Sequence, residues 1–416
     1  MLFFMNQQRR SIPPDLIRIF SILTSSMKHK SDGTQPKRIA ILGATGSIGT
    51  QALEIISANR HAYDIRGLSA HSNWKKLASV ANDFKPDWLI LSDASNKQSF
   101  EDALNYKPKQ IDYGPEALKL MAADSSLNLI LNALVGFAGF SSTYEALKSG
   151  NSVALANKES LVVGGEILTS IPGFHDRLIP VDSEHSAMWQ CLVGEEMDSV
   201  EKIVITASGG PFRDFSRDMM KSITVKDALN HPNWDMGNKI TIDSSTMMNK
   251  GLEIIEAHWL FGIDIDLIEP VIHPQSIIHS IIEFKDGSSK AQLGPPDMKV
   301  PIIYALSYPQ RHPLNVPRLD YTKRMNLSFE PVDFIKFPCV QIAIQAVKEG
   351  GIKPAVMNAA NEVAVQRFLN EEIRYIDIPV LIEKTLNKFN QKTVGSPDVL
   401  FDVDIETRKF ANTLLR

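Results

Sequence analysis

The amino-acid sequence predicts an α/β protein with a helical C-terminal region. Between residues 37 and 181, short apolar runs alternate with helical runs, a rhythm typical of a parallel, doubly wound sheet. Asp286-Gly287 separates two strand-like runs and indicates a β-hairpin, so an α/β region with an antiparallel component is expected over 182–307. Helical spacing dominates from residue 334 to the end.

Composition and charge narrow the class of protein. A chain of 416 residues is expected to form two or three domains, and 44% hydrophobic with 22% charged residues is typical of a soluble globular protein. The net charge of -4 provides no basic field for nucleic acid, and no apolar run is long enough to span a membrane. Cys191 and Cys339 form neither a disulfide framework nor a zinc pattern, which suits a reducing compartment, and we expect a cytoplasmic location.

Residues 1–36 differ in kind from the rest of the chain. They contain arginines and serines with few acids, and Arg18 interrupts their apolar pieces. We favour a disordered extension, or a start codon placed too early with Met27 as the true start. An organellar presequence is the alternative.

The first strand leads into a glycine-rich turn. The strand pattern Lys37–Leu42 continues into Gly43-Ala-Thr-Gly46-Ser-Ile-Gly49 and then into a helical run. A strand, a glycine turn and a helix N-terminus together form an anion site, because the free N–H groups of the helix face the bound phosphate. The spacing differs from the G-x-G-x-x-G fingerprint, but its position predicts a Rossmann-like nucleotide-binding domain.

The region after the second strand indicates which nucleotide is bound. Tyr63–Ala70 is followed by His71, Ser72 and Asn73, without the acid that would bond a ribose 2′-hydroxyl. This absence favours NADP over NAD. Lys75 or Lys76 would attract the 2′-phosphate, or else both are ordinary surface charges.

Further strands complete the predicted parallel sheet. They are expected at Trp88–Leu91, Ile111–Tyr113, Asn128–Asn132 and Ser152–Ala156. The last of them runs into Asn157-Lys158-Glu159-Ser160, at the sheet edge where open α/β sheets bind ligands. A polar loop with a helix cap is the alternative interpretation.

Acidic residues after the next apolar run suggest a metal. In an extended segment Asp182 and Glu184 would point the same way, and paired carboxylates suit Mg²⁺ or Mn²⁺. Glu253 is the candidate third ligand. Pairs such as Asp182 and Glu184 are also common on protein surfaces without a metal.

The segment 240–256 places several polar groups together. We predict a strand over Ile240–Asp243, a hydroxyl-rich helix start at Ser244–Thr246, and a helix from Met247. Asn249, Lys250 and Glu253 would then share one helix face, where they could hold a phosphate and a metal. The alternative is a capped surface helix with an ordinary Lys–Glu pair.

The remaining segments have simpler patterns. The strand Lys202–Thr206 ends in a glycine-rich turn from Ser208, and the polar stretch up to Gly237 is either a lid or plain loop and helix. Strands are expected at Ile272–Phe284 and Ala291–Leu293. Helices are expected at Val340–Lys348, Ala355–Leu369 and Ile378–Asn390, and we interpret Asn358, Asn361 and Glu362 as structural.

Seven motifs taken together resemble the 1-deoxy-D-xylulose 5-phosphate reductoisomerase family. They occur in order from residue 37 onwards: GATGSIG (43–49), ANKES (156–160), VDSEHSA (181–187), SGGPF (208–212), HPNWDMG (231–237), DSSTMMNKGLE (243–253) and HPQSIIHS (273–280). One departure is Ser72, where the family often has a basic residue at the NADPH 2′-phosphate.

The resemblance implies roles for individual residues. NADPH would be bound by Thr45, Gly46, Ser47, Ile48, Asn73, Asn157, Glu159 and Gly237. One divalent cation, Mg²⁺ or Mn²⁺ with Co²⁺ as a further candidate, would be held by Asp182, Glu184 and Glu253. The substrate would be contacted by Lys158, Ser183, Glu184, Ser208, His231, Trp234, Ser244, Asn249, Lys250 and Glu253, with its phosphate at Ser208, Ser244, Asn249 and Lys250. Lys158, Glu184 and His231 are the candidate catalytic residues, and which of them is the general acid or base stays open.

The implied organisation is a homodimer of multidomain chains. Its parts are an extension (1–36), an NADPH-binding domain (37–181), a catalytic metal and substrate domain (182–307) with a lid at about 208–238, a linker (308–333) and a helical domain (334–416). The implied reaction is NADPH- and metal-dependent conversion of 1-deoxy-D-xylulose 5-phosphate to 2-C-methyl-D-erythritol 4-phosphate, which leads to isoprenoids. An NADP-dependent dehydrogenase of another phosphorylated or amino acid substrate, or a non-enzymatic NADP sensor or scaffold, is the alternative.

Overall fold

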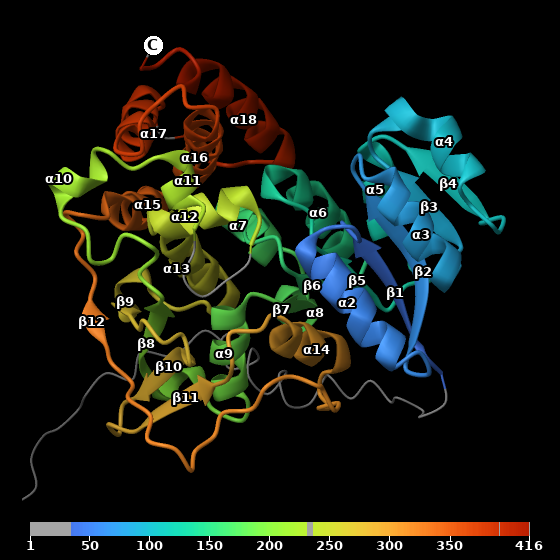
Figure 1. Cartoon of the computed structure of the whole chain (residues 1–416), viewed down its shortest axis with the longest axis horizontal. Coiled ribbons are helices and arrows are strands. Elements are labelled where there is room, and N and C mark those ends of the chain that lie inside the picture. The colour runs from blue at the N-terminus through green and yellow to red at the C-terminus, as the bar shows by residue number, and fades with distance from the viewer. Residues whose placement is uncertain (1–34, 231–235, 391, 416) are drawn as a thin grey trace, which may run out of the picture.

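The computed structural model describes residues 35–230, 236–390 and 392–415, which form two β-sheets and the helices around them (Figure 1). The first sheet has seven parallel strands in the order β4-β3-β2-β1-β5-β6-β7. The strands are β1 (Lys37–Leu42), β2 (Tyr63–Ala70), β3 (Trp88–Leu91), β4 (Gln110–Tyr113), β5 (Leu129–Asn132), β6 (Ser152–Leu155) and β7 (Leu178–Pro180). The order reverses between β1 and β5, which confirms the doubly wound α/β prediction.

Helices cover both faces of this sheet, because its central strands are apolar on both sides. In β1, Ile39 and Ile41 belong to one buried cluster, whereas Ala40 and Leu42 belong to another. The helices are α2 (Ser47–Ala58), α3 (Trp74–Phe84), α4 (Lys97–Asp102), α5 (Glu116–Ala122), α6 (Phe140–Lys148), α7 (Glu159–Thr169) and α8 (Phe174–Arg177), with short 3₁₀ helices η1 (Ala94–Asn96) and η2 (Gly136–Gly139).

The second sheet has five strands in the order β11-β10-β8-β9-β12. They are β8 (Val200–Ala207), β9 (Ile268–Ile272), β10 (Ile278–Phe284), β11 (Ser289–Leu293) and β12 (Glu330–Pro331). The hairpin between β10 and β11 is confirmed, with Gly287 at a φ of 83°. The predicted single strand Ile272–Phe284 is wrong, because a turn at residues 273–277 separates β9 from β10, with Ser276 N–H donating to His273 O at 3.0 Å.

The predicted strand Ile240–Asp243 is also wrong, because these residues lie in helix α12 (Asn238–Ser245). The alternation of β-branched residues suggested a strand, but Ile242 is buried in the core and Lys239 pairs with Asp243 one helical turn away. Residues 244–246 end α12 instead of starting the next helix. Met247, with a φ of 58°, separates α12 from α13 (Met248–Phe261).

The C-terminal region is helical, as predicted, and packs on α7, α12 and α13 (Figure 1). Its helices are α15 (Pro338–Glu349), α16 (Lys353–Leu369), α17 (Asp377–Lys388) and α18 (Pro397–Ala411). Helix α18 had no counterpart in the sequence prediction, and β12 pairs the expected linker with β9. The other elements are α9 (Ser183–Leu192), α10 (Arg217–Met220), α11 (Val225–Ala228), α14 (Lys299–Ser307), η3 (Met197–Ser199) and η4 (Ile265–Leu267). Within the described residues, every helix is too short or too polar to cross a bilayer.

Candidate active site

A cavity of about 350 Å³ collects side chains from segments far apart in the sequence. The N-terminal part of α2, which follows the glycine turn, borders it, together with the N-termini of α7 and α9, the loop after β8, and helices α12 and α13. The predicted site residues that line it are Ser47, Ile48, Lys158, Asp182, Ser183, Glu184, Ser208, Gly237, Ser244, Asn249, Lys250 and Glu253.

The glycine turn is built for a close backbone approach. Gly43 has a φ of 85°, and a Cβ atom there would lie 2.6 Å from the Ala133 carbonyl oxygen. At Gly49 a Cβ atom would lie 2.4 Å from the Gly43 oxygen, so a side chain would push α2 away from the turn. Both glycines therefore let the N-terminus of α2 face the cavity.

The three predicted metal ligands converge in the cavity. Ligand oxygens of Asp182, Glu184 and Glu253 all lie within 4.8 Å of one another. The extended geometry expected for the first two is wrong, because Asp182 caps α9 and accepts from the Glu184 backbone N–H at 3.1 Å. The first turn of a helix, closed by the cap, brings the two carboxylates together instead.

Two buried ammonium groups lie among these carboxylates. Lys158 Nζ is 2.7 Å from Asp182 Oδ2, and donates to Glu253 Oε1 and Asn249 Oδ1 at 2.9 Å each. Lys250 pairs with Glu253 and lies 3.5 Å from Glu184 Oε1. Lys158, Lys250 and Glu253 are each less than a tenth exposed, so charges of both signs are compensated locally.

Burial and neighbouring charge determine protonation in this cluster. Burial alone would lower the pKa of Lys158, but the carboxylates of Asp182 and Glu253 raise it well above its usual range. Burial raises the pKa of Glu184 to about 7, assisted by the carboxylates of Glu253 and Asp182 and opposed by Lys250. Lys158 is therefore a permanent hydrogen-bond donor, whereas Glu184 can exchange a proton near neutral pH.

A second group that could hold a metal shares Asp182 with the first. It adds His185, whose Nδ1 is 3.1 Å from Asp182 Oδ1, and Glu256, whose Oε2 lies 3.4 Å from the same nitrogen. Burial opposes protonation of His185, but Glu256 and Asp182 raise its pKa to about 9. A charged imidazole repels a cation, and His185 and Glu256 lie outside the cavity lining, so the Asp182, Glu184 and Glu253 set is the better metal site.

Several predicted cofactor residues make structural contacts away from the cavity lining. Asn73 caps α3 by accepting from Lys76 N–H, and Asn157 donates to the carbonyls of Leu134 and Gly136. Glu159 is paired with Lys239 at 2.7 Å. Thr45 and Gly46 lie in the glycine turn, where Lys76 Nζ donates to Thr45 O at 3.1 Å. His231 and Trp234 lie outside the described residues.

Sequence reasoning missed other groups at the site. Ser276 and His279 line the cavity, and burial lowers the pKa of His279 to about 4. Both belong to the HPQSIIHS motif, which was recognised without a role for its residues. Lys239 was also missed, because it comes close to its partners Glu159 and Asp243 only when α12 is helical. Asp243 in turn accepts a hydrogen bond from Asn361.

Comparisons with known families agree on one assignment. Three family descriptions match the chain: 1-deoxy-D-xylulose 5-phosphate reductoisomerase over residues 39–165, its C-terminal domain over 178–261, and the DXP reductoisomerase C-terminal domain over 293–410. A 1-deoxy-D-xylulose 5-phosphate reductoisomerase from Chloroherpeton thalassium is 51% identical over 90% of this chain and 97% of its own length. The protein of that name from Clostridium acetobutylicum is 44% identical over 90% of this chain and 98% of its own.

Solved structures give the same result. The Zymomonas mobilis reductoisomerase in complex with NADPH superposes with a TM-score of 0.85 at 42% identity, covering 91% of this chain and 99% of that one. A DOX-P reductoisomerase in complex with NADPH, fosmidomycin and magnesium gives a TM-score of 0.83 at 39% identity, covering 91% and 98%.

Proposed function

The chain belongs to the 1-deoxy-D-xylulose 5-phosphate reductoisomerase family, and from this premise we propose that the cavity around Lys158 and Glu253 is its active site. The enzyme converts 1-deoxy-D-xylulose 5-phosphate to 2-C-methyl-D-erythritol 4-phosphate in isoprenoid precursor biosynthesis, using NADPH and a divalent cation. One observation carries the site assignment: three carboxylates, two ammonium groups and the first turn of α2 border a single cavity.

The donor set fits a hard divalent cation. Asp182, Glu184 and Glu253 offer carboxylate oxygens within 4.8 Å of one another, and oxygen donors of this kind suit Mg²⁺ or Mn²⁺. When bound, the cation supplies Lewis-acid polarisation of substrate oxygens, and NADPH supplies the hydride. Ser47 and Ile48 border the cavity from the first turn of α2, which supports binding of the NADPH phosphates at the N-terminus of that helix.

The polar side chains would orient the sugar and hold its protons. Lys158 keeps its proton and can donate to a substrate oxygen beside Asp182 and Glu253. Ser183 Oγ already donates to Glu184 Oε2 at 2.6 Å, which orients that carboxylate. Burial raises the pKa of Glu184 to about 7 in the metal-free protein, so Glu184 would give up its proton when it binds the cation. The role of His231 remains a prediction.

The substrate phosphate would lie among four polar residues of the cavity lining. Ser208 follows β8, Ser244 lies in α12, and Asn249 and Lys250 lie in the first turn of α13, all on the cavity lining. Phosphate contacts of this kind supply binding energy that orients the reacting carbons without touching them.

The first test is NADPH absorbance over time with 1-deoxy-D-xylulose 5-phosphate, with Mg²⁺ and then with a chelator. We expect metal-dependent oxidation in the wild type, and a fall in kcat of about 1000-fold in E253Q, because a lost metal ligand removes several kcal/mol of stabilisation. E256Q is the matched control, since Glu256 is equally buried one turn along α13 but lies outside the cavity lining.

The outcomes separate the alternatives. Oxidation that ignores the chelator, with an active E253Q, would indicate a plain dehydrogenase and contradict the metal site. A folded protein that binds NADPH without turnover would indicate a sensor. A larger loss in E256Q than in E253Q would move the cation to the group formed by Asp182, His185 and Glu256.

The family resemblance also supports proposals about organisation. We propose a cytoplasmic homodimer that acts on a small phosphorylated sugar, with the division into domains at 37–181, 182–307 and 334–416 given above. Light scattering would test the dimer, with a monomeric mass of 46.3 kDa as the contradicting result.

A further inference from the structure

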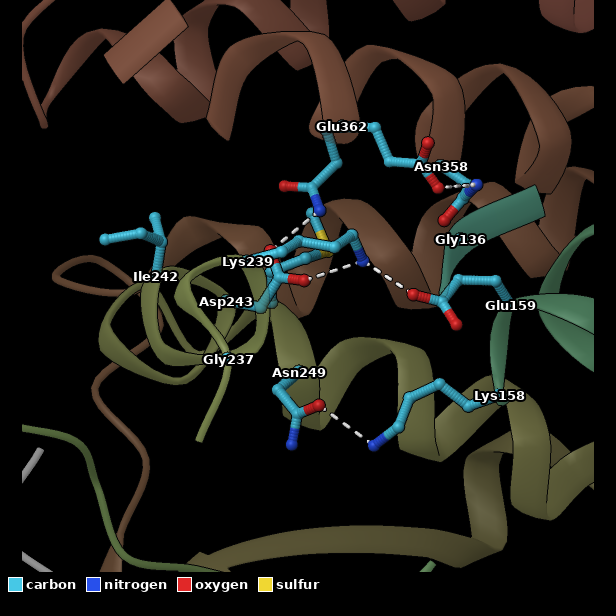
Figure 2. A network of polar contacts seen from close by, with 12 residues as sticks. Gly136, Lys158, Glu159, Gly237, Lys239, Ile242, Asp243, Asn249, Asn358 and Glu362 are labelled. Carbon is cyan, nitrogen blue, oxygen red and sulfur yellow. Dashed lines mark hydrogen bonds and ion pairs between the residues drawn. The ribbon is translucent and has the colours of Figure 1, made fainter. Parts of the chain in front are cut away.

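A second buried ionic network lies beside the active site (Figure 2). Lys239 Nζ donates to Glu159 Oε1 at 2.7 Å and to Asp243 Oδ2 at 2.9 Å. Asn361 Nδ2, from α16, donates to Asp243 Oδ1 at 2.8 Å. The network therefore joins α7 to α12 through Lys239, and α12 to α16 through Asp243.

Helix α12 presents different residues to its two sides. Ile240 and Ser244 are four apart and both line the active-site cavity, as does Gly237 at the N-cap. Lys239 and Asp243 are also four apart and form the ionic stripe next to them. Adjacent residues on a helix differ by about 100° in direction. Contacts that hold Lys239 and Asp243 in place therefore also determine the direction in which Ile240 and Ser244 point.

The network is also tied to the catalytic lysine through the main chain. Glu159 directly follows Lys158, at the start of α7. Figure 2 shows that Lys158 reaches α13 at Asn249, whereas Glu159 reaches α12 at Lys239. Lys158 also donates to Glu253 of α13. The N-terminus of α7 therefore holds both helices that carry the proposed phosphate contacts.

We propose that Lys239 is a positioning residue of the reductoisomerase: its ion pair with Glu159 of α7 sets the orientation of α12, and thereby places Ser244 and Ile240 in the active site. Its pair with Asp243 lies within α12 and holds the Lys239 side chain in place. This inference rests on the active-site assignment made above. The carboxylates of Glu159 and Asp243 are both buried, so a cation from solvent would have to lose its hydration to replace the Lys239 ammonium group.

The test is K239M, measured in the full-length enzyme. We expect kcat/KM for 1-deoxy-D-xylulose 5-phosphate to fall by about 10- to 100-fold, because misplacing a binding group by about 1 Å has an effect of that size. K239R, which retains the charge, should recover most of the loss. The affinity for Mg²⁺, measured by calorimetry, should stay within about threefold of wild type, because the metal ligands lie on α9 and α13. Hydrogen exchange should accelerate in residues 238–245.

A milder pair of variants guards against misfolding of K239M. Asn358 and Asn361 are both fully buried on α16, one turn apart, but Asn358 donates to Glu362 and Asn361 donates to Asp243 of α12. N361A should therefore lower kcat/KM and accelerate exchange in α12. N358A should lower the melting temperature to a similar extent while kcat/KM stays near that of the wild type.

The results separate this inference from the site assignment. Suppose that K239M and N361A both keep the kcat/KM and the α12 hydrogen exchange of the wild type, while E253Q is inactive. That result would overturn the positioning role of Lys239 and leave the active-site assignment intact. Equal losses in N361A and N358A, or a parallel loss of Mg²⁺ affinity in K239M, would also overturn it, because both would indicate general destabilisation. An active E253Q would instead contradict the active site itself.

Discussion

The two ionic clusters on either side of the α7 N-terminus are chemically alike but differ in what surrounds them. The Lys158 cluster combines Asp182, Glu184 and Glu253 with two lysines and borders the cavity. The Lys239 cluster combines Glu159 and Asp243 with one lysine and lies against buried amides of Asn157 and Asn361. In the first, carboxylates face a space that a ligand can enter; in the second, protein donors complete their hydrogen bonding.

This difference shows how one set of residue types can serve binding or structure. A carboxylate that retains an accessible lone pair can accept a cation, whereas a carboxylate saturated by lysine and asparagine donors holds two helices in register. Whether a ligand can reach the carboxylates, more than the local charge, therefore separates the binding cluster from the structural one.

The largest expected effect comes from removing either lysine. In metal-free protein, K158M and K239M should each lower the free energy of unfolding by about 3–5 kcal/mol, because each leaves buried carboxylates uncompensated. Saturating Mg²⁺ should return most of the stability of K158M, since a cation can bind the carboxylates that face the cavity, and little of that of K239M. Urea denaturation with and without Mg²⁺ measures this. Equal rescue of the two variants would contradict the comparison.

A smaller effect is expected at Asp243. D243N keeps the shape but weakens the bonds to Lys239 and Asn361, so the unfolding free energy should fall by about 2–3 kcal/mol at neutral pH. The exposed pair of Asp218 and Lys221 provides the control, since D218N should leave the melting temperature unchanged. A D243N protein as stable as the wild type would show that the network contributes little to holding α12.

The smallest effect is a pH dependence of stability at Glu184. Burial raises the pKa of Glu184 from 4.5 to about 7, so the folded state holds the proton more tightly than the unfolded state. Its contribution to stability is complete below pH 4.5 and is lost as the pH rises through 7. At pH 8 without metal, E184Q should therefore be more stable than wild type by about 1–2 kcal/mol, with the difference absent near pH 5. Thermal unfolding at both pH values measures it, and a destabilised E184Q at pH 8 would contradict the assignment.

Much of the first sheet was predictable because its signals are local. Runs such as Trp88–Leu91 are short, apolar and bounded by turn residues, and the glycine turn at Gly43 follows directly from β1. The identities of Asp182, Glu184 and Glu253 as one group also came from the sequence, and the structure brings them together. The local geometry did not follow, since Asp182 and Glu184 meet in a capped helical turn.

The errors lie where tertiary packing overrides local preference. Thr241 and Ile242 favour strands by their β-branched side chains, yet burial of Ile242 and the pairing of Lys239 with Asp243 require a helix. Glu330 and Pro331 have no strand pattern and pair with β9 only because the chain passes its edge. Asn361, interpreted as structural, does make a structural bond, but its partner Asp243 is 118 positions away.

The sequence by itself determined the residue types of the site, the parallel sheet and the family. The tertiary structure alone decided which charges face the cavity and which face the protein interior. Lys158 and Glu159 are neighbours in the chain, yet their side chains enter different clusters, because successive residues at the start of α7 point in different directions. Local patterns report what a residue can bind, whereas only the packing of α7, α12, α13 and α16 determines what lies within its reach.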